Sequence, residues 1–427
     1  NCTEEQFQQK GSEILENNLR SVKAGYEFVR QNLKIKSSFT VPLSKNVQRK
    51  MLLTGSQAIA LGAMASGLKF YSGYPMSPAT SIMEFVASHA EKYNIVFEQA
   101  EDEIAAINMV IGANFAGVRA MTATTGGGFC LMAEALSLAG MTETPAVIIV
   151  SQRPGPSTGL PTRTEQADLN FVMHAGHGDF PRAVLAPGYP EQAVHLMGKA
   201  FNLADKYQIP VIVLSDQHLN DSYFTVDELD FEDIVIDRGR ILSDQDLPSP
   251  HEYNRYRADD SGISPRILPG LTKAILYADS DEHTAAGHIT ESAAIRNQMM
   301  RKRMQKIIGI QQEIGPPKIY PNGQAELVLL GWGSTYGVIK EAVDQLNQNG
   351  NSAQMIHYSE IFPFNPQHVA TEQLGKSKVV AVENNYTGQF ADLFSKATGL
   401  SIDQRILKYD GRPFTSREIL DQINYTH

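Results

Sequence analysis

Hydrophobic positions between residue 51 and about residue 225 fall into short apolar runs separated by amphipathic windows. The runs have the length and composition of strands and lie at 68–74, 95–99, 118–124, 145–151, 182–187 and 210–216. The windows between them are helix-like and lie at 56–67, 78–92, 102–116, 128–140 and 190–206. Strands that alternate with helices of about 10–15 residues predict a parallel sheet with helices on both faces.

The chain before this region has a different pattern. Residues 4–33 predict one long amphipathic helix, because apolar side chains recur every three or four positions. They form a single stripe of Leu15, Leu19, Val22, Tyr26 and Val29. Residues 34–50 are polar and basic and predict a linker. Since the chain lacks an initiator Met and begins inside a helical pattern, we expect that residue 1 is not the start of the encoded polypeptide.

The chain after this region divides into two parts. Residues 226–320 are rich in Asp, Ser, Pro and Arg, which predicts a long extended connection with one basic helix at 292–313. A smaller α/β unit follows. Its strands are expected at 326–333, 352–360 and 378–385, and its helices at 335–348, 388–397 and 416–424. The fold class is therefore α/β, with a large parallel-sheet domain and a smaller second domain.

Composition narrows the possible functions. The 427 residues suffice for roughly two to three domains. A net charge of −10 argues against a nucleic-acid binder, and no apolar run of about 18 residues predicts a membrane span. Cys2 and Cys130 are the only cysteines, too few for an iron–sulfur cluster held by this chain. Their scarcity favours a reducing, cytoplasmic environment.

Candidate chemistry is expected where the strands end, because ligands of parallel sheets bind at the carboxyl edge. The turn after the first strand contains Pro75, Ser77 and Pro78. Two interpretations are open for it. Ser77 caps a helix that begins at Pro78, or its hydroxyl and the helix N-terminus bind an anionic substrate.

Acidic residues follow the second strand. Glu98, Glu101, Asp102 and Glu103 all lie near the start of a helix, where any carboxylate is favoured by the helix dipole. Glu103 is distinguished by small residues three and nine positions later, which let the helix pack closely against another chain or a ligand. A buried Glu103 would stay neutral and donate a hydrogen bond.

Two further turns complete the edge. Residues 124–128 form a Gly-rich turn after the third strand, which allows a ligand to approach the backbone closely. It is not a phosphate loop, because no Lys-Ser or Lys-Thr follows at the required spacing. The loop 151–164 after the fourth strand is rich in Pro, Gly and hydroxyls and carries Arg153, a natural partner for a carboxylate. A surface arginine in a long connection is the alternative.

Two other patterns are weaker. His174, His177 and Asp179 lie close together, but no further ligand cluster has metal spacing, so we expect no metal site on this chain. The segment 331–337 resembles a dinucleotide-binding turn only loosely, and we interpret it as a packing feature.

Taken together, the strand-end motifs resemble those of the alpha subunits of 2-oxoacid:ferredoxin oxidoreductases, most closely the 2-oxoglutarate type. The segments that carry the resemblance are GSQAIALGAMASGLKFYSGYPMSP (55–78), QAEDEIAAINMVIGANFAG (99–117), TATTGGGFCLMAEAL (122–136), SQRPGPSTGLPTRTEQADL (151–169), HITESAAIR (288–296) and VENNYTGQ (382–389). The resemblance covers about residues 51–427.

The resemblance implies a domain plan and a cofactor. It implies a thiamine diphosphate pyrimidine-binding (PYR) domain at 51–240 and a transketolase C-terminal-like domain at 322–427, joined by the segment 241–321. Residues 1–50 resemble the end of a fused gamma-type domain.

The resemblance also implies roles for single residues. Glu103 falls at the glutamate that binds the aminopyrimidine N1′ of thiamine diphosphate, and Pro75, Gly126 and Gly128 would line the cofactor. The implied substrate-binding residues are Ser77, in the turn that holds the substrate, Arg153, which pairs with the 2-oxoacid carboxylate, and Thr162, for the distal carboxylate of a dicarboxylic acid. Met76-Ser77 replaces the more usual Ile-Thr, Thr125-Gly126-Gly127-Gly128 replaces Ser-Gly-Pro-Gly, and Cys130 replaces Ser. These departures bear on substrate preference more than on the reaction.

The chain lacks the Gly-Asp-Gly…Asn-Asn pattern that binds diphosphate and Mg²⁺ in the family, since Asn384-Asn385 has no such partner upstream. The resemblance therefore implies that Mg²⁺ and a 4Fe–4S cluster lie on a beta subunit, with coenzyme A as co-substrate and ferredoxin as electron acceptor. The implied reaction is oxidative decarboxylation of 2-oxoglutarate to succinyl-CoA, or its reverse. The alternatives are a pyruvate or branched-chain substrate, a nucleotide-linked dehydrogenase and a non-catalytic scaffold.

Overall fold

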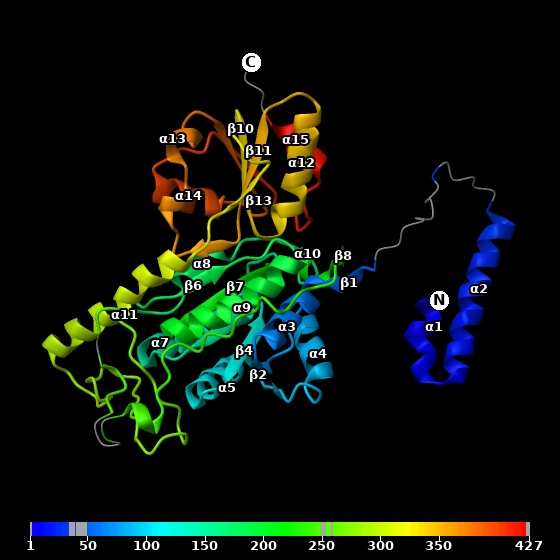
Figure 1. Ribbon diagram of the computed structural model, residues 1–427. Coiled ribbons are helices and arrows are strands. Elements are labelled where there is room, and N and C mark those ends of the chain that lie inside the picture. Colours follow the sequence, from blue (N-terminus) through cyan, green and yellow to red (C-terminus); the bar gives the residue numbers. More distant parts are fainter. Residues whose placement is uncertain are drawn as a thin grey trace. The chain divides into compact units, whose positions relative to one another are not determined.

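A computed structural model describes residues 2–33, 39, 49–247, 249, 253–257 and 259–423 (Figure 1). The chain divides into two compact units, residues 1–49 and 50–427. The expected linker at 34–50 lies almost entirely outside the described residues.

The first unit consists of helices α1 (Cys2–Phe7), η1 (Gln8–Lys10) and α2 (Ser12–Asn32). The prediction of one helix over 4–33 is wrong, because Gly11 adopts a φ of +98° that ends the first helical segment. Within this unit the predicted stripe lies on α2, where Leu15 and Leu19 are half-buried and the other three residues are exposed, Val22 by 58% and Tyr26 by 63%.

A seven-stranded sheet, called the large sheet below, organises the second unit. Its strands run in the order β12-β6-β7-β5-β4-β2-β3, and all neighbours are parallel except β12 and β6. The strands span Leu68–Gly73 (β2), Val96–Gln99 (β3), Arg119–Thr124 (β4), Ala146–Gln152 (β5), Ala183–Leu185 (β6), Pro210–Asp216 (β7) and Glu360–Phe362 (β12). The predicted parallel sheet is thus confirmed, with strand ends shifted by a few residues at most.

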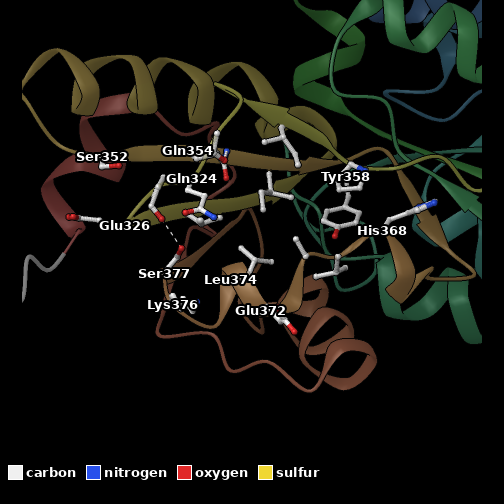
Figure 2. A pocket seen from close by; sticks show the side chains of 18 residues that line it. Gln324, Glu326, Ser352, Gln354, Tyr358, His368, Glu372, Leu374, Lys376 and Ser377 are labelled. Carbon is white, nitrogen blue, oxygen red and sulfur yellow. Dashed lines mark hydrogen bonds between the residues drawn. The ribbon is translucent and has the colours of Figure 1, made fainter.

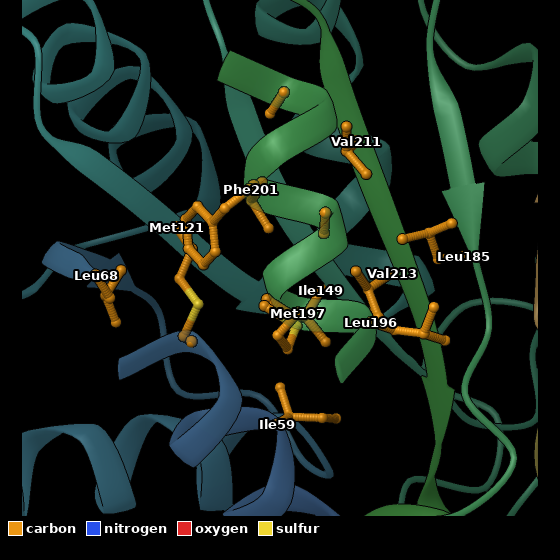
Figure 3. Close-up of a cluster of buried hydrophobic side chains, with 14 of the residues drawn as sticks. Ile59, Leu68, Met121, Ile149, Leu185, Leu196, Met197, Phe201, Val211 and Val213 are labelled. Carbon is orange, nitrogen blue, oxygen red and sulfur yellow. The ribbon is translucent and has the colours of Figure 1, made fainter. Parts of the chain in front are cut away.

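Helices cover both faces of this sheet. They are α3 (Gly55–Ala65), α4 (Thr80–His89), α5 (Glu103–Ala116), α6 (Gly126–Leu131), α7 (Ala133–Thr142), α8 (Leu169–His174), α9 (Pro190–Tyr207) and α10 (Gln217–Asp221). Alternate residues of one strand enter different cores. Ile149 and Val213 pack with α3 and α9 in one core (Figure 3), whereas Ile148 and Ile212 belong to the other. This alternation explains why the central strands are apolar at nearly every position.

A small two-stranded sheet was not anticipated. β1 (Met51–Thr54) pairs antiparallel with β8 (Tyr223–Val226), so the start and the end of the first α/β region lie side by side.

The connecting segment is anchored to the large sheet by buried charges. It contains α11 (Ala293–Glu313), close to the helix predicted at 292–313. Lys302 and Lys306 of this helix each approach Glu143 to 2.5 Å, and all three side chains are buried. Burial alone would raise the pKa of Glu143, but the two lysines outweigh it and hold that pKa below its usual range. The basic character of α11 therefore serves internal packing.

The C-terminal region, residues 318–423, contains a five-stranded sheet, called the small sheet below. Its strand order is β14-β13-β10-β11-β9, and only β9 is antiparallel to its neighbour. The strands are β9 (Lys318–Tyr320), β10 (Leu327–Trp332), β11 (Ala353–Tyr358), β13 (Lys378–Glu383) and β14 (Gln404–Leu407). The helices of this region are α12 (Tyr336–Gln348), α13 (Thr371–Leu374), α14 (Gln389–Thr398) and α15 (Ser416–Gln422), with short 3-10 turns η3 (Gly333–Thr335) and η4 (Pro366–His368). A further 3-10 turn, η2 (Asp244–Asp246), lies in the connecting segment.

The predicted strand at 352–360 is in fact two elements. β11 ends at Tyr358, and the chain then crosses to the large sheet as β12, where Glu360 pairs with Leu185. Within the described ranges, no helix has both the length and the apolar character that a membrane crossing requires.

Candidate active site

The Glu103 carboxyl is the most distinctive group at the carboxyl edge of the large sheet. Glu103 is the first residue of α5, and Asp102 caps this helix by accepting a 2.8 Å hydrogen bond from the Ala105 N–H. Glu103 is only 3% exposed, and its Oε1 has no hydrogen-bond partner among the described residues. Burial, and to a lesser degree the neighbouring Asp102, raise the pKa of Glu103 against an opposing backbone hydrogen bond. The pKa shift is in the direction of the neutral, proton-donating form that the sequence predicts.

The Gly-rich turn fits closely around this carboxyl. A Cβ atom on Gly128 would lie 2.5 Å from Glu103 Oε1 and 2.0 Å from Thr124 Oγ1. A Cβ on Gly126 would lie 2.5 Å from Asp168 Oδ2. Glycine is thus required at both positions, since any side chain would displace a carboxyl group.

The structure also brings Arg153 to the turn after β2. Arg153 Nη1 donates a 2.6 Å hydrogen bond to the Ser77 carbonyl oxygen, and Ser77 itself is exposed. The alternative in which Ser77 caps a helix starting at Pro78 is wrong, because α4 begins at Thr80 and its N-cap is Ala79. Partial burial lowers the pKa of the Arg153 guanidinium.

Thr162 and Ser77 line one cavity of about 280 Å³. The rest of its lining consists of Pro78, Thr80, Ser81, Glu84, Pro161 and Asp221. Pro75 is exposed in the same turn as Ser77. Thr125 Oγ1 donates a 2.7 Å hydrogen bond to Met76 Sδ, which connects this turn to the Gly-rich turn. A continuous series of contacts therefore runs from Arg153 through the turn after β2 to Glu103.

Two acidic residues at this edge were not singled out from the sequence. Burial raises the pKa of Asp168 to about 6, and burial together with Asp168 raises the pKa of Glu165 to about 7. Both lie in the segment 151–169, but nothing in their local pattern signals a buried carboxyl. The Asp168 carboxyl lies against Gly126 of the Gly-rich turn, which is distant in sequence, and Glu165 in turn is influenced by Asp168.

The turn at 331–337 packs closely against neighbouring side chains. A Cβ on Gly331 would lie 2.2 Å from Ile339 Cδ1, and the fully buried Trp332 donates from Nε1 to Glu383 Oε2 at 3.1 Å. The turn is therefore filled by protein, as expected for a packing feature. Among the described residues, no group of three or more His, Cys, Asp or Glu side chains is arranged to hold a metal ion.

A second cavity, of about 480 Å³, lies in the C-terminal region (Figure 2). It follows one face of the small sheet, where Gln354 and Tyr358 of β11 oppose Leu374 of α13. Its lining does not include the candidate residues, so it is separate from the edge that holds Glu103.

Residues 61–302, more than half of the chain, match the family described as pyruvate flavodoxin/ferredoxin oxidoreductase, thiamine diP-bdg. The 2-oxoglutarate synthase subunit KorA of Methanothermobacter thermautotrophicus is 30% identical, with 87% of this chain and 97% of that protein aligned. The chain belongs to the alpha-subunit family of the 2-oxoacid:ferredoxin oxidoreductases. The resemblance noted from the strand-end motifs is confirmed at this level.

Other members of this alpha-subunit family are similar. Subunit alpha of 2-oxoacid:ferredoxin oxidoreductase 1 from Sulfurisphaera tokodaii is 39% identical over 94% of this chain. The chain spans 65% of the length of that relative, and 64% and 63% of two others. A solved 2-oxoglutarate:ferredoxin oxidoreductase from Magnetococcus marinus, with 2-oxoglutarate, coenzyme A and succinyl-CoA bound, has 34% identity and a TM-score of 0.88. The match covers 98% of this chain and 72% of that one.

The residues of this alpha-subunit chain fit a thiamine diphosphate site. The buried Glu103 Oε1, without a partner among the described residues, can bond to an aminopyrimidine nitrogen. Gly128 leaves the space that keeps this oxygen in place. Both features lie at the carboxyl edge of a parallel sheet, where such folds bind ligands.

Proposed function

We propose that this chain is the alpha subunit of a thiamine-diphosphate-dependent enzyme that converts 2-oxoglutarate and coenzyme A to succinyl-CoA and CO₂ and reduces ferredoxin. The reverse carboxylation would use the same groups. The observation that carries the proposal is the buried Glu103 carboxyl against Gly128, with an Oε1 that has no hydrogen-bond partner among the described residues. The choice of 2-oxoglutarate is supported by the names of the KorA relatives and of the Magnetococcus marinus structure.

Thiamine diphosphate, when bound, supplies a carbon nucleophile for the keto group and takes up the electrons left after decarboxylation. Glu103 would share its proton with N1′ of the aminopyrimidine, because burial favours the protonated carboxyl. Gly126 and Gly128 would let the cofactor approach the backbone, and Pro75 would line the cofactor from the turn after β2. These residues prepare the site without supplying the redox chemistry.

Arg153 and Ser77 would hold the 2-oxoacid. The guanidinium would pair with the 1-carboxylate, while its existing bond to the Ser77 carbonyl fixes its position. Thr162 lines the same cavity as Ser77 and would donate to the distal carboxylate. A dicarboxylic substrate satisfies both ends of this arrangement, which favours 2-oxoglutarate over pyruvate or a branched-chain acid.

The remaining parts of the active site would come from a partner. We assign Mg²⁺ and a 4Fe–4S cluster to a beta subunit, since the Asn-Asn pair of this chain is engaged internally. Asn385 Nδ2 donates to the Gln166 carbonyl oxygen at 3.0 Å, and its Oδ1 accepts from the Gly388 N–H at 2.7 Å.

Further partners would be ferredoxin and a gamma-type domain. We assign the exposed apolar residues Val22, Tyr26 and Val29 of α2 as the surface that contacts the gamma-type domain. Both cysteines are free thiols, which suits the reducing cytoplasm.

Reconstitution tests the proposal. The chain co-expressed with a beta subunit should reduce a viologen dye when 2-oxoglutarate and coenzyme A are added, and competition with pyruvate and branched-chain acids should rank the substrates. The lone chain should show neither turnover nor tight binding of thiamine diphosphate. Robust 2-oxoacid-dependent dye reduction by the lone chain would contradict the proposal that the active site is shared with a beta subunit. An inactive complex would favour the non-catalytic scaffold alternative.

A further inference from the structure

The small sheet has a carboxyl edge of its own, and this edge is occupied by a segment of the same chain. Open parallel sheets bind ligands at the carboxyl ends of their strands. Here the ends of β10 and β13 instead contact residues 164–170, which follow the loop that carries Arg153 and Thr162.

Gln166 is the centre of these contacts. It is 1% exposed, and each of its polar groups bonds to the C-terminal region. Its amide Nε2 donates to the Trp332 carbonyl at 2.9 Å, and its Oε1 accepts from the Asn384 N–H at 3.1 Å. Its backbone N–H donates to the Asn384 carbonyl at 2.7 Å, and its carbonyl accepts from Asn385 Nδ2 at 3.0 Å.

Gln389 of α14 extends this set of bonds toward α8. Its Nε2 donates to the Ala167 carbonyl at 2.7 Å, and its Oε1 accepts from the Asn170 N–H at 2.8 Å. Both bonds cross from the C-terminal region to the segment after the loop.

The loop 153–163 itself is held from both sides. At its ends, the Asp168 N–H donates to Gln152 Oε1 at 3.0 Å, which closes the loop. At its tip, a Cβ on Gly411 would lie 2.9 Å from Leu160 Cδ1, so the C-terminal region contacts the tip directly. The position of Thr162, four residues before Gln166, therefore depends on the small sheet.

We infer that the C-terminal region, through Gln166 and Gln389, fixes the substrate loop 153–163 in the position that binds the 2-oxoacid. Both are positioning residues, because they contact the loop segment and not the reacting atoms. The inference rests on the proposed function and adds to it the part of the molecule that sets affinity for the acid. A preformed loop loses little freedom on binding, so releasing it should weaken substrate binding more than it slows the chemical step.

Gln389→Met tests this, because methionine keeps the volume and removes both bonds. Gln354→Met is the matched control. Gln354 is 6% exposed and makes two bonds from Nε2 to the carbonyls of Pro321 and Gly323, at 2.9 and 2.8 Å, away from the loop. In the complex with the beta subunit, Gln389→Met should raise KM for 2-oxoglutarate about fivefold or more with kcat within about twofold, while Gln354→Met changes neither.

Hydrogen exchange gives a second readout that needs no activity. Amides of residues 154–165 should exchange faster in Gln389→Met than in the wild-type chain or in Gln354→Met. Equal KM values, or unchanged exchange of this loop, would overturn the inference. If the wild-type complex has no 2-oxoacid-dependent activity, the proposed function fails while the exchange comparison still decides the role of Gln389.

If Gln389→Met does not fold, Gln389→Glu replaces it. Glutamate keeps the acceptor for the Asn170 N–H but places an acceptor oxygen against the Ala167 carbonyl in place of the donor, so a rise in KM and faster exchange of the loop are again expected. Wild-type values for both measurements would count against the inference.

Discussion

Replacing Glu103 with glutamine separates the proposed catalytic role of this carboxyl from its effect on folding. The two side chains have the same shape, so the packing against Gly128 is kept. Glutamine cannot share a proton with a pyrimidine nitrogen in the way that a neutral carboxyl can. Glu101, two residues earlier and exposed, provides the control substitution Glu101→Gln.

The expected loss in kcat/KM follows from the single hydrogen bond between Glu103 and the cofactor that the substitution would weaken. Oε1 is buried without a partner among the described residues, so a bond to the cofactor would be its main interaction. A hydrogen bond to a charged group contributes about 1.5–3 kcal/mol, which corresponds to a loss of about 10- to 150-fold in kcat/KM. The free energy of unfolding of the chain alone should stay equal or increase, because burial disfavours the ionised carboxyl that glutamine removes.

Two assays on the same variants test the expected loss of activity and the expected effect on stability. Dye reduction by the reconstituted complex measures the loss, and urea unfolding of the lone chain measures stability. Loss of activity together with a large loss of stability would point to a purely structural residue. Activity of Glu103→Gln equal to that of Glu101→Gln would refute the assignment altogether.

Three further changes have defined outcomes. Gly128→Ala should reduce activity at least as much as Glu103→Gln, because the added Cβ would lie 2.5 Å from Glu103 Oε1; a normal kcat would argue against the tight fit. Thr162→Val should raise KM for 2-oxoglutarate about 2- to 12-fold and leave KM for pyruvate unchanged, as steady-state kinetics with both acids would show. Raised pKa values of about 6 for Asp168 and about 7 for Glu165 mean that the contribution of these two carboxyls to folding stability is present at acid pH and is lost as the pH rises through these values. In urea midpoints measured between about pH 5 and pH 8, Glu165→Gln should show a shallower decline than the wild type, and identical slopes would contradict the buried carboxyl.

Local pattern was sufficient to predict much of the large sheet and the burial of Glu103 at its carboxyl edge. The run predicted at 210–216 is the observed strand Pro210–Asp216, because a central strand buried on both faces is apolar throughout. The burial of Glu103 was also predictable, since small residues along its helix indicate a close approach.

Other features depend on contacts that no local window contains. The segment 352–360 reads as one strand, and only the pairing of Glu360 with Leu185 shows that its end belongs to another sheet. The raised pKa of Asp168 arises from burial beside the Gly-rich turn, about 40 residues earlier. The break at Gly11 could have been predicted, because glycine within a helical pattern is a common point of interruption. The regular apolar spacing that follows it favoured one continuous helix instead.

The short strand β12 has a consequence for how this polypeptide can be divided. Because it supplies the outermost strand beside β6, a fragment that stops before residue 322 would leave the outer edge of β6 unpaired, while its other edge still pairs with β7. Open strand edges of this kind recruit other chains and aggregate. Genetic fission between the two sheets should therefore yield an insoluble amino-terminal piece, and the two halves cannot be exchanged between homologues as independent modules.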